Sequence, residues 1–515
     1  MSTTFTSPPS DVLPAQLSRW LLGAGLASLL LRFWLATTFP ITGDEAFFYW
    51  WGVYPAWGYS DHPPMVGWLI WLMRMTFGEG TGSIRLPVVL LPLALGGALW
   101  WALKPLDRVR AAWAVLFFWL APVNWLNMLI TTDTPLIFWS AWSVAALFRA
   151  EQRAKLDRAA YGLYALSGLL LGFAFLSKYF SVILGLTYLV YFVMFRRERL
   201  AGFAALVACA LPGPAINIAW NMGHGWSNIM FNVYNRNEDA VFAWRKPGLY
   251  ALMLVYLATP AMVWLGWRRR AAVWAAARQQ RLLVCLVIVP LIFFALLSGK
   301  KVIGLHWVLS FYPFAFAFMA FALPADKLKA CAKGMALFAG LHVLVVAGLS
   351  LTHLDNWKNA GLYPQIIRSY KTAEMLKQVE APGVVLMGEA FTPASIFGYE
   401  RKQYMPVFGV GKFHSRQDDQ LVDFSFYQGK TIRVIVGGPP NLAEYAPYFA
   451  TVRVLDFNES GVPFYAVEGT GFNYQAYRQG VLATIFHRYY NIPTFLPMTG
   501  CPFCERFCGQ VRCSR

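Results

Sequence analysis

The chain has 515 residues, of which 57% are hydrophobic and only 14% are charged, with a formal net charge of +18. This composition is too apolar for a soluble chain of that length and predicts a protein that crosses a membrane several times. The basic excess would suggest nucleic acid in a soluble protein. Here it falls in short loops between apolar segments, where membrane topology accounts for it, so we exclude nucleic-acid binding.

The first 18 residues are polar and lack the basic start and small-residue cleavage site of a removed signal. We therefore expect 1–18 to be a cytoplasmic tail and 19–352 to be a membrane domain, with its first outer loop at 40–84. Segments long enough to cross a bilayer predict about eleven spans, with an uncertainty of one or two. These are Trp20–Phe39, Leu86–Leu103, Ala111–Ile130, Pro135–Phe148, Tyr161–Leu176, Phe180–Phe195, Gly202–Trp220, Pro247–Trp267, Leu282–Leu297, Leu305–Leu323 and Gly334–Leu351.

Basic residues occupy every second loop between these segments. Because Lys and Arg collect in cytoplasmic loops, the N-terminus and these basic loops are predicted to lie inside. The first loop, the turn Thr131–Asp133, the loop Asn221–Lys246 and everything after His353 then lie outside. The basic loops contain Lys104, Arg108 and Arg110; Arg149, Arg153, Lys155 and Arg158; Arg196, Arg197 and Arg199; Arg268, Arg269, Arg270, Arg278 and Arg281; and Lys327, Lys329 and Lys333.

The first outer loop concentrates acidic and aromatic side chains. Residues 41–64 read ITGDEAFFYWWGVYPAWGYSDHPP, with Asp44, Glu45, Asp61 and His62 among the rings. Carboxylates beside a membrane span are costly unless hydrated, paired or metal-bound, and are therefore candidates for function. Tandem acids followed by an acid–imidazole pair could abstract a proton and bind a cation or phosphate. The alternative is an interfacial loop whose charges simply face water.

Several basic residues break the inside rule and are predicted at the outer ends of spans. Each could simply extend to the lipid headgroups. Together with the acids of the first loop, they suit a phosphate-bearing substrate held at the membrane surface. We therefore expect both sets to line one cavity. The outward residues are Arg85, Lys178, Lys300, Lys301 and His306, on the same side as Asp133 and His224.

Hydropathy drops after His353, and 353–500 reads as a mixed α/β domain outside the membrane. Strands are predicted at Val384–Met387, Ile432–Val436, Val452–Leu455 and Phe464–Val467, and helices at Thr372–Val379 and Leu442–Phe449. The tail 501–515 contains Cys501, Cys504, Cys508 and Cys513. Its spacing matches no strong zinc pattern, so disulfides or an irregular terminus are favoured over a metal site.

The motifs together resemble a known family. Gly43-Asp44-Glu45-Ala46, followed by Trp57-Gly58-Tyr59-Ser60-Asp61-His62-Pro63-Pro64, resembles the first-loop signature of GT-C membrane glycosyltransferases. The similar branch is the protein mannosyltransferase and aminoarabinose transferase superfamily, including the rhizobial lipopolysaccharide galacturonosyltransferases. Further similar segments are Thr132-Asp133-Thr134-Pro135, Leu176-Ser177-Lys178-Tyr179, Trp220 to Trp226, and Lys301 with His306-Trp307. The C-terminal domain carries no recognisable acceptor motif.

The resemblance implies a GT-C fold, a polyprenyl-phosphate-linked sugar donor, an acceptor outside the membrane and inversion at the anomeric carbon. It places Asp44 as the general base with Glu45 beside it, and His62 facing the donor phosphate. It places Asp61 as a contact for a divalent cation and, more remotely, His224 as a second contact for the metal or the phosphate, with no nucleotide cofactor. Tyr59 belongs to the same motif. A bacterial inner-membrane enzyme that acts on lipid A, lipopolysaccharide, another envelope glycan or protein is the expectation.

Two other classes of protein fit part of the pattern. A transporter or flippase of lipid-linked sugars would explain the many spans, but it predicts polar residues and broken helices near the membrane midplane. A membrane scaffold with an outer binding domain would leave the paired acids and outer lysines unexplained.

Overall fold

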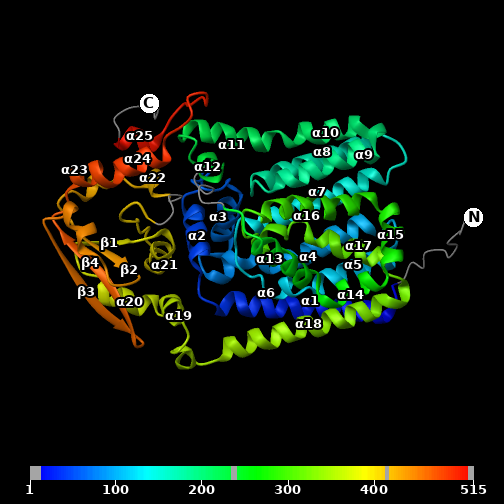
Figure 1. The fold of residues 1–515 in the computed structure, drawn as a ribbon, viewed down its shortest axis with the longest axis horizontal. Coiled ribbons are helices and arrows are strands. Elements are labelled where there is room, and N and C mark those ends of the chain that lie inside the picture. The colour runs from blue at the N-terminus through cyan, green and yellow to red at the C-terminus, as the bar shows by residue number, and fades with distance from the viewer. Residues whose placement is uncertain (1–12, 234–240, 412–416, 508–515) are drawn as a thin grey trace, which may run out of the picture. The chain divides into compact units, whose positions relative to one another are not determined.

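The computed structural model describes residues 13–233, 241–411 and 417–507 (Figure 1). The chain forms two compact units. The helical unit comprises Met1–Thr38, Arg85–Pro214 and Ala240–Leu351, and the α/β unit comprises Phe39–Ile84, Ala215–Asp239 and Thr352–Arg515. The first outer loop and the segment after Pro214 therefore fold with the C-terminal part of the chain.

The helical unit is built from packed apolar helices. Six helices described by the structure are long and apolar enough to cross a membrane, or seven if one bent pair counts as a span. With the fold reported below, this makes the chain an integral membrane protein; the predicted count of eleven spans stays a prediction. The helices are α1 (Ala15–Thr38), α4 (Thr81–Leu103), α5 (Arg108–Leu120), α6 (Pro122–Leu126), α7 (Asp133–Glu151), α8 (Arg158–Phe175), α9 (Ser181–Phe195), α10 (Leu200–Ala210), α13 (Arg245–Ala258), α14 (Pro260–Arg268), α15 (Arg270–Gln279), α16 (Arg281–Ser298), α17 (Tyr312–Ala322) and α18 (Ala325–Leu351). Helix α11 (Pro212–Gly223) belongs to the α/β unit from Ala215 onward.

Three predicted spans are not continuous helices. Leu305–Leu323 starts with a 3₁₀ turn, Leu305–Val308, before α17 begins at Tyr312, and proline explains the breaks in the other two. The predicted Ala111–Ile130 span breaks between α5 and α6, where Pro122 opens the second helix. The predicted Pro247–Trp267 span breaks into α13 and α14, which meet at 92°. Thr259 lies at the bend with φ of 65°, directly before Pro260. Proline lacks an N–H and disfavours helical backbone in the residue before it, so the hydropathy continues while the helix does not.

Proline inside α4 is tolerated because an arginine supplies the missing donor. Pro92 cannot donate to the carbonyl of Val88, four residues earlier. Arg32 of α1 donates through its guanidinium to that carbonyl, and to the carbonyl of Val89 at 3.3 Å. Arg32 is 1% exposed, so these hydrogen bonds satisfy a fully buried cation. The contact joins α1 to α4.

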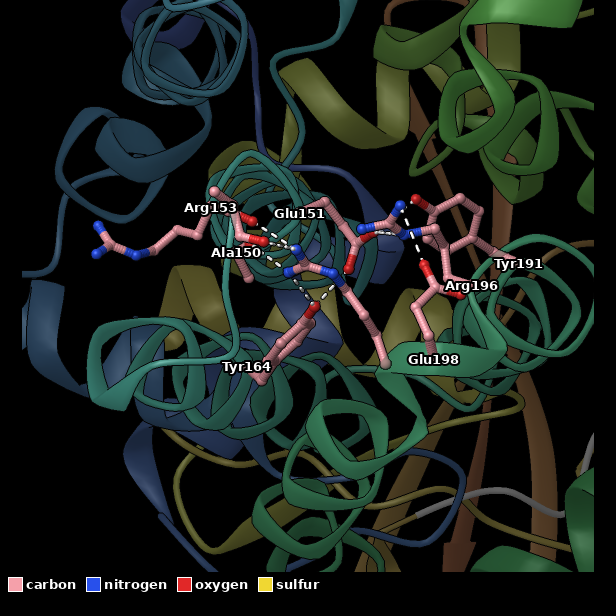
Figure 2. A network of polar contacts seen from close by, with 9 residues as sticks. Ala150, Glu151, Arg153, Tyr164, Tyr191, Arg196 and Glu198 are labelled. Atoms are coloured by element: carbon pink, nitrogen blue, oxygen red, sulfur yellow. Dashed lines mark hydrogen bonds and ion pairs between the residues drawn. The ribbon is translucent and has the colours of Figure 1, made fainter.

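A polar network closes one end of the α7 to α10 bundle (Figure 2). Glu151, at the end of α7, accepts hydrogen bonds from Tyr164 and from Tyr191, the latter at 2.8 Å. Its carboxylate also lies 2.7 Å from Nε of Arg196. Arg199 donates to the carbonyl of Ala150 at 3.3 Å, near the C-terminus of α7. These contacts satisfy the helix-end carbonyls and hold the basic loops predicted to lie inside.

In the α/β unit, four strands form one sheet of order β1-β2-β4-β3. The strands are β1 (Val384–Gly388), β2 (Thr431–Val436), β3 (Thr451–Glu459) and β4 (Val462–Thr470). β1 and β2 are parallel, and the other pairs are antiparallel. All four predicted strands are confirmed, as is the helix α20 (Thr372–Val379). The predicted helix Leu442–Phe449 is wrong: two short 3₁₀ turns occupy it, with Pro447 in the second.

The described part of the tail, residues 501–507, contributes to the core of this unit. Cys501, Phe503 and Cys504 are fully buried, and the Phe503 ring stacks on Tyr490 at 4.4 Å. Cys504 is disulfide-bonded, which agrees with the predicted preference for disulfides. Cys508 and Cys513 lie outside the described residues. Residues 502–507 form helix α25 (Pro502–Phe507).

Candidate functional site

The tandem acids begin helix α2 (Gly43–Val53), which follows Thr42. Glu45 is fully buried, and its carboxylate accepts hydrogen bonds from both the backbone N–H and the hydroxyl of Thr42, each at 3.1 Å. This is the capping interaction that an acid three residues into a helix can make. Asp44 is exposed. The two acids therefore differ: Glu45 holds the helix start, and Asp44 presents its carboxylate at the positive end of the helix.

Tyr59 fixes the return of the loop against α2. Its ring stacks on Trp51 with centroids 4.3 Å apart, and its hydroxyl donates to the Trp51 carbonyl at 2.8 Å. Burial raises the pKa of the phenol, so it stays protonated at physiological pH. Gly67, in α3 (Met65–Phe77), provides the space for the Tyr59 ring, because a Cβ at this position would lie 2.3 Å from the Tyr59 hydroxyl oxygen. Tyr59 thus has a structural role in the motif: it fastens the end of the loop to α2.

The turn that carries Asp61 and His62 is held from one further segment. Asn228 donates to the carbonyl of Tyr59 at 2.8 Å, and Asn232 to that of Asp61 at 2.7 Å. Both belong to α12 (Ser227–Val233). The His62 ring lies 6.2 Å from both Phe48 and Trp51 of α2. Asp61 and His62 are therefore fixed next to the helix that carries Asp44.

The C-terminal part of the unit packs directly on this loop. Helix α21 (Phe391–Arg401) lies against α2, with the Phe391 and Phe47 rings 5.0 Å apart. A Cβ on Gly43 would lie 2.0 Å from the Thr392 methyl group, so only glycine fits before Asp44. The side chain of Gln417 accepts the backbone N–H of Ser60 at 3.1 Å. The α/β domain is therefore part of the support of the acidic loop.

His224 follows α11 in the same unit. Its ring stacks on Trp220 at 4.2 Å, and Nδ1 lies 2.7 Å from the Trp220 carbonyl. A carbonyl only accepts, so Nδ1 carries the proton and a neutral ring keeps a lone pair on Nε2. Burial lowers the pKa of His224, which favours that neutral form. The ring is therefore prepared to accept a proton or to bind a cation.

In the helical unit, two predicted site residues meet as a buried ion pair. Lys178 donates to both carboxylate oxygens of Asp133, each at 2.8 Å. The side chains are 11% and 9% exposed. The Lys178 ammonium also lies 5.2 Å from the Phe180 ring, which in turn packs on Trp307 at 4.9 Å. The segments predicted to face the same side are thus neighbours within this unit.

The remaining predicted cations also lie in the helical unit. Arg85 is fully buried and donates to the carbonyl of Ala36 at 3.0 Å, in the last turn of α1. Lys300 is exposed, and its backbone carbonyl accepts the Lys246 ammonium at 2.7 Å. Lys301 is half-buried, and His306 is exposed in a short 3₁₀ helix, Leu305–Val308. Arg85 thus holds the end of α1, whereas Lys300 and His306 are exposed.

The arrangement of the His, Cys, Asp and Glu side chains gives little support for a metal site among the described residues. Within 13–233, 241–411 and 417–507, no three His, Cys, Asp or Glu side chains gather as a metal-binding group. Asp61 and His224 therefore do not belong to a complete ligand set among the described residues, and we assign no chemical step to a metal.

Sequence reasoning missed the polar residues that position the acidic loop, namely Asn228, Asn232, Thr392 and Gln417. Of these four residues, only the two asparagines could have been identified from a pattern in the sequence. Asn228 and Asn232 stand four residues apart in an otherwise apolar segment, a spacing that aligns them on one helix face. Thr392 and Gln417 act on residues more than 340 positions earlier in the chain, so no local pattern could reveal them.

Known proteins share parts of this chain. Residues 61–220 match the family described as dolichyl-phosphate-mannose-protein mannosyltransferase. The lipid A galacturonosyltransferase RgtD of Rhizobium johnstonii is 28% identical over 239 residues, which is 44% of this chain and 46% of the relative. The match thus spans about half the length of that curated relative.

The fold extends further than the sequence match. ArnT from Cupriavidus metallidurans in the apo state superposes with a TM-score of 0.65 at 14% identity, over 88% of this chain and 98% of ArnT. The same protein bound to undecaprenyl phosphate gives a TM-score of 0.64 at 13% identity, over 87% and 98%. These similarities confirm the resemblance drawn from the motifs. The chain has the GT-C fold of membrane glycosyltransferases.

Proposed function

We propose that this chain is an inverting glycosyltransferase of the bacterial inner membrane. It would transfer a sugar from a polyprenyl-phosphate donor to a hydroxyl acceptor on the outer face of that membrane. The observation that carries the proposal is the exposed Asp44 at the start of α2, a helix whose Phe48 ring lies near the His62 ring, in a chain with a GT-C fold.

The chemistry needs a base and a stabilised leaving group. Asp44 accepts the proton of the acceptor hydroxyl as its oxygen forms the new bond to the anomeric carbon. The bond from that carbon to the donor phosphate breaks, and the electron pair leaves with the lipid phosphate. Basic groups stabilise the charge on that phosphate; His62, Lys301 and His306 are the candidates, and Lys178 would serve through its pair with Asp133.

The donor and acceptor classes rest on relatives. ArnT has been crystallised with undecaprenyl phosphate, which supports a polyprenyl-phosphate donor here. RgtD acts on lipid A, which supports a lipid A or related glycolipid acceptor. Because Lys and Arg occupy alternate loops, we infer that the α/β unit faces the periplasm. In Figure 1, α15 and the turn from α9 to α10 lie at the same end of the helical unit, as that topology requires.

The test is transfer of a labelled sugar from its polyprenyl phosphate to lipid A by the protein in membranes. Asp44→Asn keeps the shape and removes the base, so we expect the rate to fall about a hundred- to ten-thousand-fold. Asp355→Asn, at an exposed carboxylate of the same unit, is the matched control and should transfer normally. Wild-type rates from Asp44→Asn would refute the role of Asp44.

The fold and the relatives do not favour the transporter that the sequence left open, although α13 and α14 meet at a bend, a feature found in transporters. Acceptor-dependent release of polyprenyl phosphate distinguishes the two, since transport leaves the sugar–phosphate bond intact. A divalent cation is tested separately: activity that is lost on chelation and returns with Mg²⁺ or Mn²⁺ would add a metal to Asp61.

A further inference from the structure

A groove on the helical unit lies between α1, α5, α6 and α18. Its volume is about 460 Å³, within the usual range of small-ligand sites. Trp20 and Trp125 stand at its walls, and its lining along α18 runs from Ala332 to Val343. At 1.5 Å per residue this is about 16 Å, close to the thickness of one leaflet of a membrane core of about 30 Å.

The groove is open because small residues face it. Gly23 and Ala24 of α1 line it opposite Ala336 and Gly340 of α18. A Cβ added to Gly23 or to Gly340 would meet nothing within 4 Å, so neither glycine is needed for close helix packing. The outer faces of the same helices carry exposed leucines instead, Leu22 at 65% and Leu337 at 79%. The two helices lie beside each other in Figure 1 and are joined by a hydrogen bond from Lys329 to Gln16.

Two cations line the groove together with Trp20. Arg19, in the first turns of α1, and Lys333, in the first third of α18, both border it and are exposed. Within the described part of the chain, neither side chain has a recorded hydrogen bond or ion pair. Both belong to the helix ends that carry the predicted cytoplasmic charge. Basic pockets between spans on that side are suited to anionic headgroups, whereas a second copy of this face would bring like charges together.

We propose that this groove is a binding site for one anionic phospholipid of the cytoplasmic leaflet. An acyl chain lies along the small residues of α1 and α18, and the headgroup phosphate lies at Arg19 and Lys333. The site is independent of the proposed transfer reaction, since it needs neither donor nor acceptor.

The experiment is native mass spectrometry of the purified full chain, reconstituted with equal amounts of phosphatidylglycerol and phosphatidylcholine that carry the same acyl chains. Two basic residues near an anionic headgroup should together favour phosphatidylglycerol about 30-fold. Arg19→Gln with Lys333→Gln should abolish that preference. Ala336→Trp should fill the groove and remove the retained lipid of either type.

Matched variants make the result specific. Arg270→Gln with Arg278→Gln removes the same charge from exposed residues of α15, and Leu337→Trp adds a comparable ring on the outer face of α18. Both should retain phosphatidylglycerol like the wild type. Equal retention of the two lipids by the wild type would overturn the proposal. So would phosphatidylglycerol retention unchanged in Ala336→Trp, or a groove variant that alters the oligomeric mass rather than the bound lipid.

Discussion

Breaking the ion pair between Asp133 and Lys178 tests whether Lys178 serves the fold or the reaction. Both ammonium–carboxylate distances are 2.8 Å, and the side chains are only 11% and 9% exposed. Removing one partner of such a buried pair leaves an uncompensated charge and costs about 3–5 kcal/mol. We therefore expect Lys178→Met and Asp133→Asn each to lower the unfolding midpoint by several degrees.

The double variant separates the two roles. With both charges gone, most of the lost stability should return, so the double-mutant cycle should give a large coupling energy. Thermal unfolding in detergent measures stability, and transfer of labelled sugar at a matched fraction of folded protein measures function. If the double variant is stable but inactive, Lys178 contributes its charge to the donor phosphate. Single variants that unfold like the wild type would refute the buried pair itself.

Three further changes test the α/β unit, two of them in the acidic loop. Gly43→Ala should destabilise the α/β unit by about 1–3 kcal/mol through overpacking. Adding Thr392→Ser should recover stability, because it removes the methyl group that a Cβ on residue 43 would meet at 2.0 Å. If thermal unfolding shows no such recovery, the packing contact is not the cause. Thr42→Ala should cost about 0.5–2 kcal/mol by removing the N-cap hydroxyl that Glu45 accepts, and unchanged unfolding would show that the cap carries no stability. Burial lowers the pKa of His224, so as pH falls below about 6.5 the unfolded chain gains a proton before the folded chain does, and stability falls. The unfolding midpoint between pH 7.5 and 5 should therefore drop less in His224→Gln, and identical slopes would refute the assignment.

The sequence alone determined the membrane class, the strands of the C-terminal domain and the residue types of the acidic loop. These features follow from local patterns: apolar runs of bilayer length, alternation in strands, and a motif whose residues are close together in the chain. Proline set the limit of this reasoning, since hydropathy runs through Pro122 and Pro260 whereas the helix cannot.

Tertiary structure decided which members of the motif are buried in structural contacts and which stay exposed. Asp44 and Glu45 are adjacent in sequence, yet the Glu45 carboxylate caps the start of α2 while Asp44 is exposed. Thr392 and Gln417 reach this loop from the C-terminal domain because the chain folds its first loop and its last part into one unit. Long-range contacts of this kind depend on packing between distant segments, and no periodicity or spacing within either segment encodes them.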